Sequence, residues 1–153
     1  MQTSGQSRAW RWRREPSRLT QVCIVTDGTV AGSFEDALAA RLGSAAQVAL
    51  LHLIDPAATH AEWIASRGRS RAETRTPVNA IEQAIEPLPR DSRLLLCSRN
   101  VADLEWLGGV IGQRVFFAPY RPEANPEIQI NAVIGTVEET LRASLTEKWG
   151  DSY

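Results

Sequence analysis

The sequence has few of the features that mark membrane, secreted and metal-binding proteins. Its 153 residues contain two cysteines, two histidines and a single lysine, Lys148. No apolar run approaches the ~20 residues that span a bilayer, and no secretory signal is visible. Cys23 and Cys97 lie inside expected strands, and their spacing from the histidines does not suit a zinc site. We therefore expect a cytoplasmic protein with free thiols, no transmembrane segment and no metal.

Sequence motifs for catalysis and for phosphate binding are missing as well. The glycine fingerprint of dinucleotide-binding proteins is absent, and no lysine follows a glycine-rich loop. Asp27-Gly28-Thr29 is similar to part of the D-x-D-G-T motif of haloacid-dehalogenase-like phosphatases, but Val25 occupies the nucleophile position. Neither cysteine has a His–Asp pattern nearby that would activate it. We expect no catalytic residues and no enzymatic activity.

What the sequence does contain is a βαβ pattern between residues 20 and 56. An apolar run over about 20–26 ends at Asp27-Gly28, and a second apolar run covers about 47–54. Continuous apolar runs of this length are typical of buried parallel strands. Between them, helical spacing relates Phe34, Ala37, Leu38 and Leu42, and Gly43 follows as a helix end.

The pattern continues through the rest of the chain with alternating helices and strands. The segments are a short helix at 57–66, a helix from Pro77 to about 88, a strand at 93–98, a helix at about 103–114 and a strand at 115–118, with a further short strand within 72–76. This order predicts an α/β domain over residues 19–119. We expect a doubly wound, mainly parallel five-stranded sheet with helices on both faces.

Residues 120–153 form a C-terminal extension with a different pattern. Thr136 followed by Glu139 predicts a helix start with a capping box. Val137, Leu141, Leu145 and Trp149 then form a stripe of an amphipathic helix. Residues 127–134 fit either a strand or an extension of that helix. The stripe could pack on its own sheet or contact a partner or a second copy.

Residues 1–18 lack apolar periodicity, and we expect a flexible basic arm. The arm holds five arginines and one glutamate, whereas the remainder carries 12 basic and 17 acidic residues. Its centre alternates tryptophan and arginine: Trp10, Arg11, Trp12, Arg13 and Arg14. These residue types anchor protein interfaces, and they also bind nucleic acid or anionic lipid. A solvated tail without a partner is the remaining interpretation.

Several of these segments together resemble the universal stress protein family. The family's D-G-S-like turn after the first strand is matched by Asp27-Gly28-Thr29, and its L-L-H-V-V-D-P strand by residues 50–56. Its G-S-R-G segment after the fourth strand is matched by residues 97–100, its G-S-V-A-E-R-V by 109–115, and its P-V-L-V-V strand by 115–119. The resemblance covers about residues 20–119. It implies a Rossmann-like fold, a role in stress response and a nucleotide site, and the matching positions here are Asp27, Ile54, Arg99, Asn100 and Gly109.

The chain departs from that family at its phosphate loop. Asn100 and Asp103 replace two glycines of the ATP-binding members, and Val110 replaces a hydroxyl residue. Bulky side chains and an added carboxylate disfavour a triphosphate. We therefore expect a non-enzymatic accessory or regulatory module without a cofactor. Its arm and C-terminal helix would contact a partner protein or a second copy in a homodimer. The alternative is an ATP- or AMP-binding stress protein with an atypical loop.

Overall fold

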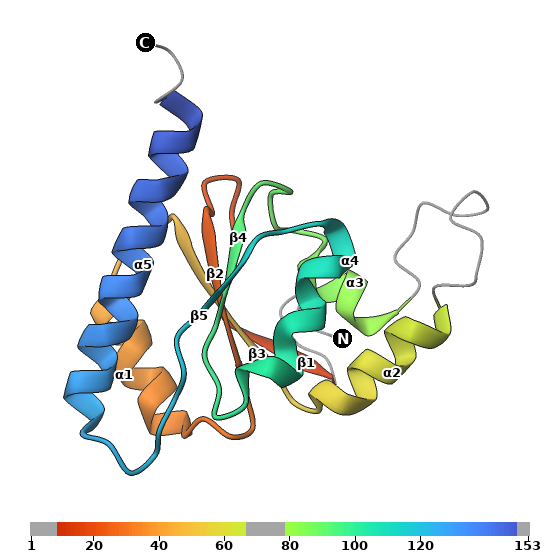
Figure 1. The fold of residues 1–153 in the computed structure, drawn as a ribbon, viewed down its shortest axis with the longest axis horizontal. Coiled ribbons are helices and arrows are strands. Elements are labelled where there is room, and N and C mark those ends of the chain that lie inside the picture. The colour runs from red at the N-terminus through yellow and green to blue at the C-terminus, as the bar shows by residue number, and fades with distance from the viewer. Residues whose placement is uncertain (1–8, 67–78, 150–153) are drawn as a thin grey trace.

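The computed structural model describes residues 9–66 and 79–149, which build an α/β fold around one five-stranded sheet (Figure 1). The strand order is β1-β3-β2-β4-β5. The strands are β1 Trp10–Arg14, β2 Val22–Asp27, β3 Val48–Leu53, β4 Arg93–Leu96 and β5 Val115–Phe117. Strands β2 to β5 are parallel, and β1 joins the edge at β3 in the antiparallel direction. The expectation of a mainly parallel sheet is confirmed.

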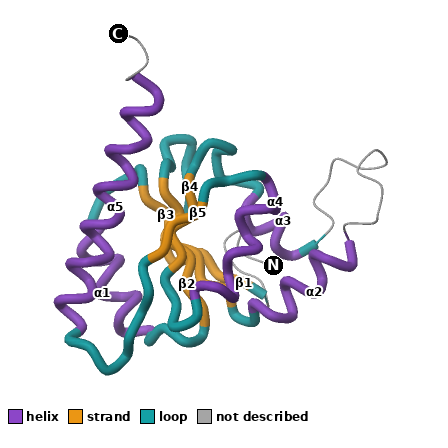
Figure 2. Tube along the Cα trace, viewed as in Figure 1, coloured by secondary structure: helices purple, strands orange, loops and turns teal. Residues whose placement is uncertain are grey.

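Helices cover both faces of this sheet, as the sequence predicts (Figure 2). They are α1 Gly32–Leu42, α2 Pro56–Ser66, α3 Ala80–Ile85, the 3-10 helix η1 Val101–Leu107, α4 Gly108–Ile111 and α5 Pro126–Trp149. Alternate residues of β2 point to opposite faces. Val22 and Ile24 meet α1 and α5, while Cys23 and Val25 meet the layer of α2, α3 and η1. Two apolar cores therefore sandwich the sheet.

The prediction of a flexible arm is wrong for residues 10–14, which form β1. Trp10 pairs with Leu53, and Trp12 pairs with Leu51. Because side chains alternate along a strand, both tryptophans enter the core at 6% and 8% exposure, while Arg11 and Arg13 point to the other face. Burial of the two indoles stabilises β1 at the edge of the sheet. The arginines on its other face keep that edge polar. Residues 1–8 lie outside the described part.

Among the described residues, the fifth strand of the sheet is β1. The strand expected within 72–76 lies outside the described residues. An antiparallel edge strand needs no crossover helix, so β1 can join the sheet directly ahead of the βαβ unit.

The helix expected at about 103–114 is instead a 3-10 segment, η1, followed by the single turn α4. Gly112, with a φ of +80°, ends α4. A Cβ at Gly108 would lie 2.6 Å from Cγ2 of Val115. This close approach requires glycine, and it lets the chain turn back sharply into β5.

Helix α5 begins at Pro126, so residues 127–134 are helical and the predicted start at Thr136 is wrong. The backbone N–H groups of Glu127 and Ile128 donate to Oδ1 of Asn125, which provides the cap. The Thr136 hydroxyl lies inside the helix and donates to the carbonyl of Ala132. The buried stripe consists of Ile130, Val133, Val137, Thr140 and Ser144.

Candidate ligand pocket

The carboxyl ends of β2 and β3 open into a pocket of about 700 Å³. The first turn of α2 and the helix η1 form its other walls. Open parallel sheets place their binding crevices at this end of the strands. The lining residues are Asp27, Gly28, Thr29, Ile54, Asp55, Pro56, Ala57, His60, Ala102, Asp103, Glu105 and Trp106.

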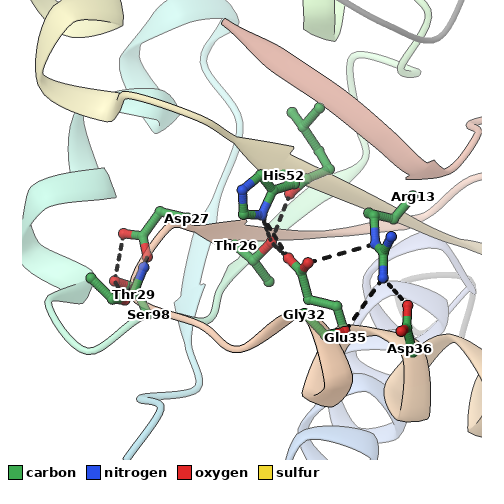
Figure 3. Close-up of polar contacts among 10 residues, drawn as sticks. Arg13, Thr26, Asp27, Thr29, Gly32, Glu35, Asp36, His52 and Ser98 are labelled. Atoms are coloured by element: carbon green, nitrogen blue, oxygen red, sulfur yellow. Dashed lines mark hydrogen bonds and ion pairs between the residues drawn. The ribbon is translucent and has the colours of Figure 1, made fainter.

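Asp27, which lines the pocket, is held by donors from two loops (Figure 3). Its Oδ1 accepts from the N–H of Thr29 at 2.9 Å and from the Thr29 hydroxyl at 2.5 Å. Its Oδ2 accepts from the Ser98 hydroxyl at 2.7 Å. The side chain is buried, and both carboxylate oxygens are engaged. Asp27 therefore ties the turn after β2 to the segment after β4.

The backbone donors that follow β4 are engaged in the same network. The N–H of Arg99 donates to Oγ1 of Thr29, and the N–H of Asn100 donates to Oγ of Ser98, each at 3.0 Å. In a phosphate loop, such N–H groups point at the anion. In this chain the two N–H groups instead donate to hydroxyl oxygens of the protein.

The outer wall of the pocket is aromatic and apolar. The rings of His60 and Trp106 stack with centroids 4.6 Å apart and planes 15° apart. Trp63 packs behind Trp106 at 5.6 Å between ring centroids. Indole Nε1 of Trp106 donates to the backbone carbonyl of Asp103 at 2.9 Å, which fixes the ring. Ile54 is 49% exposed at the pocket.

The pocket is also strongly acidic. Four of its lining residues are Asp27, Asp55, Asp103 and Glu105, and no lysine or arginine is among the described residues that line it. Oδ1 of Asp55 accepts from the N–H of Ala58 at 3.1 Å, so it caps the first turn of α2. Within the described residues, the carboxylates of Asp103 and Glu105 have no hydrogen bond or ion pair and are exposed.

Of the nucleotide positions that the sequence suggests, the structure brings Asp27 and Ile54 together in this pocket. Arg99, Asn100 and Gly109 are not among its lining residues. His60 and Trp106, which form the aromatic wall, are not among the predicted site residues; the sequence places His60 just past a strand end, near the expected crevice, but favours a surface position on a helix. They come from α2 and η1, and only the spatial contact of these two helices brings them together.

The arginines expected to bind a partner are largely used inside the molecule. Oδ1 of Asp36 accepts from Nη2 of Arg13. Nη1 and Nη2 of Arg14 each donate at 2.8 Å, to the carbonyls of Gly43 and Ala45. Only Arg11 of the five predicted contact residues in β1 is exposed. The expectation that Trp10–Arg14 forms a free docking segment is therefore wrong.

A second polar cluster, centred on Glu35, joins β1, β2, β3 and α1 (Figure 3). Oε2 of Glu35 lies 2.7 Å from Nδ1 of His52 and accepts from the Thr26 hydroxyl. Oε1 lies 3.6 Å from Nε of Arg13. Glu35 is 1% exposed, so these contacts compensate for the burial of its charge. The cluster fastens β1 to the body.

Both cysteines are free thiols buried in the core. Burial raises the pKa of Cys23 well above its usual range. Burial, together with the nearby charges of Asp27 and Glu35, raises the pKa of Cys97 to about 12. Because the thiolate is the nucleophilic form, neither cysteine is suited to covalent catalysis.

We expect both thiols to resist Ellman's reagent at pH 8 in the native protein and to react fully after unfolding in guanidinium chloride. The raised pKa suppresses the thiolate, and the core excludes the reagent. The absorbance of released thionitrobenzoate measures both states. Rapid release of one equivalent from the native protein would contradict this assignment.

Comparisons with known proteins found no matching family model, curated protein or solved structure. The universal-stress-protein resemblance therefore stays a prediction. Within residues 9–66 and 79–149, no helix is both long and apolar enough to cross a membrane. In the same residues, no three His, Cys, Asp or Glu side chains are grouped so that they could hold a metal ion.

Proposed function

We propose that this chain is a cytoplasmic, non-enzymatic accessory or regulatory module that acts through protein–protein association. The contact element is α5, and the N-terminal segment that the sequence suggested contributes to the core instead. The buried thiols and the engaged carboxylate of Asp27 support a role without covalent or acid–base catalysis. The partner best matched to α5 is a second copy of the chain.

An apolar stripe on α5 that the body leaves partly uncovered carries this proposal. Ile134 and Leu141 are half-buried, and Leu145 is 48% exposed. At 3.6 residues per turn, these three side chains lie within about 40° of one another. Their mean direction is about 80° round the helix axis from that of the buried stripe. Aliphatic side chains aligned on one helix face are suited to pairing with another helix.

The charges beside this stripe favour a second copy. Glu138 and Arg142 form an exposed ion pair, one turn apart, with 3.9 Å between Oε2 and Nη2. A two-fold axis near residue 140 would place Glu138 of each copy opposite Arg142 of the other. Two-fold dimers use one self-complementary patch in this way.

We expect Leu145→Glu to weaken self-association by about tenfold or more, because it places a carboxylate in the apolar contact. Sedimentation equilibrium over a range of protein concentrations measures the change in dissociation constant. Leu145 is half-exposed, so the fold should tolerate the substitution, and circular dichroism checks this.

Ile128→Glu is the matched control, since Ile128 is 67% exposed on the same helix but points away from the stripe. This variant should associate as the parent chain does. A parent chain that stays monomeric at all concentrations would contradict the proposed second copy. Equal weakening by both variants would contradict the assigned face.

Nucleotide binding is the alternative, and the position of Asp27 and Ile54 in the pocket favours it. The carboxylates around the pocket and the engaged N–H groups after β4 oppose the phosphates of ATP or AMP. We therefore favour association over nucleotide binding.

A further inference from the structure

We propose that the pocket at the ends of β2 and β3 binds a small organic cation with an apolar body, of the arylalkylammonium class. This site is separate from the α5 stripe and does not depend on the proposed association. The inference rests on the pocket's combination of an aromatic wall with an acidic lining that includes no lysine or arginine among its described residues.

The walls of the pocket suit the apolar body of such a ligand. Ile54, Pro56, Ala57 and Ala102 supply aliphatic surface, and the stacked His60–Trp106 pair supplies a flat aromatic surface. A volume of about 700 Å³ accommodates a two-ring molecule, and ligand pockets in general combine apolar walls with a few polar groups. The indole of Trp106 can also attract a nearby cation through its electron-rich ring.

The carboxylates of the pocket select positive charge. Asp103 and Glu105 precede Trp106 on η1, line the same pocket and have no partner within the described residues. An ammonium group bound in the pocket would be attracted by the negative charge of both. The acidic side chains are not grouped to coordinate a metal ion, within the described residues. Their charge is spread along the wall, an arrangement suited to a larger organic cation.

Three backbone N–H groups at or near the pocket that could favour an anion are engaged. Asp55 caps the amino terminus of α2 through the N–H of Ala58. Hydroxyl oxygens of Thr29 and Ser98 accept from the N–H groups of Arg99 and Asn100. The positive ends of these backbone dipoles are thus paired within the protein, and the carboxylates determine the sign of the local field.

Three indole probes that differ mainly in charge test the proposal. Isothermal titration calorimetry of the full chain at low salt compares tryptamine (cationic), tryptophol (neutral) and indole-3-propionate (anionic), with ATP as a phosphate-bearing probe. We expect tryptamine to bind about threefold to tenfold more tightly than tryptophol, because two partly solvated carboxylates act on the ammonium. Indole-3-propionate should bind more weakly than tryptophol, and ATP should give no heat.

The paired variant D103N/E105Q should remove the preference for tryptamine over tryptophol and leave tryptophol binding unchanged. Both side chains are exposed, and the hydrogen bond of Trp106 uses the Asp103 backbone, so the fold is preserved. The control E15Q/E86Q removes the same charge from exposed positions that line no part of the pocket, and it should keep the preference.

Equal binding of tryptamine and tryptophol would overturn the proposal, as would tighter binding of indole-3-propionate or ATP. The absence of heat for every probe at millimolar concentration would overturn it as well. A preference for tryptamine that survives in D103N/E105Q would show that these carboxylates do not select the charge, which also contradicts the proposal.

Discussion

Replacing Trp12 with alanine is expected to lower the free energy of unfolding by about 3–5 kcal/mol. Trp12 is 8% exposed and belongs to the core cluster that contains Leu51, Ile81 and Leu96. Removing the indole leaves a cavity between β1 and the layer of α2 and α3, and it weakens the attachment of the edge strand. Urea unfolding followed by circular dichroism measures the loss.

The neighbouring residue on the same strand provides the control for this prediction. Arg11 pairs with His52 but is exposed, so Arg11→Ala should change the free energy of unfolding by no more than about 0.5 kcal/mol. If Trp12→Ala were equally mild, β1 would not be docked in solution, and the flexible arm expected from the sequence would be the correct description.

This placement of Trp10 and Trp12 changes how a truncation would be interpreted. Deleting residues 1–18 removes two core tryptophans and Arg13, which contacts Glu35 and Asp36. Loss of association after such a deletion would therefore report a damaged fold, not a missing contact segment. Point substitutions on α5 avoid this ambiguity.

The β2–α1–β3 unit was predictable because its signals are local. Apolar runs of strand length, a turn at Asp27-Gly28 and a helical stripe through Leu38 all lie within 35 residues of sequence. Strand β1 was not recognised because its partner β3 lies more than 30 residues away. The alternation of Trp and Arg has the period of a strand, but the positive charge of the segment favoured the interpretation of a flexible arm.

The errors on α5 have a geometric cause. Steps of four residues advance about 400° round a helix, so each step of the expected stripe drifts by about 40°. The expected stripe therefore begins at Val137, which is buried, but includes Leu145, which is 48% exposed. Alternating steps of three and four keep the true stripe on one face. The side chain of Trp149 lies outside the described residues.

The pocket was predictable only where strand ends define it. Asp27 and Ile54 follow two parallel strands, so their proximity follows from the βαβ pattern. Trp106 depends on η1 being a 3-10 helix, and the sequence predicted an α-helix there. His60 follows the end of β3 closely, but its stacking on Trp106 depends on the packing of α2 against η1, which no local pattern encodes.

Replacing Glu35 with alanine is the second substitution expected to have a large effect, with a loss of about 3 kcal/mol in the free energy of unfolding. The variant removes the acceptor of Thr26, the partner of Nδ1 of His52 and the carboxylate beside Nε of Arg13. It also leaves a small buried cavity. Glu35→Gln preserves the shape but not the charge, so its loss should be smaller, about 1–2 kcal/mol.

Asp36→Ala isolates the contribution of burial, because Asp36 is the next residue and contacts the same arginine. Its side chain is 72% exposed, whereas that of Glu35 is 2% exposed. Water screens the exposed pair, so Asp36→Ala should cost no more than about 1 kcal/mol. Chemical denaturation of the three variants measures their losses in the free energy of unfolding and so gives the order of these losses. Equal losses for Glu35→Ala and Asp36→Ala would mean that the buried cluster does not fasten β1, and that the indoles alone hold the strand.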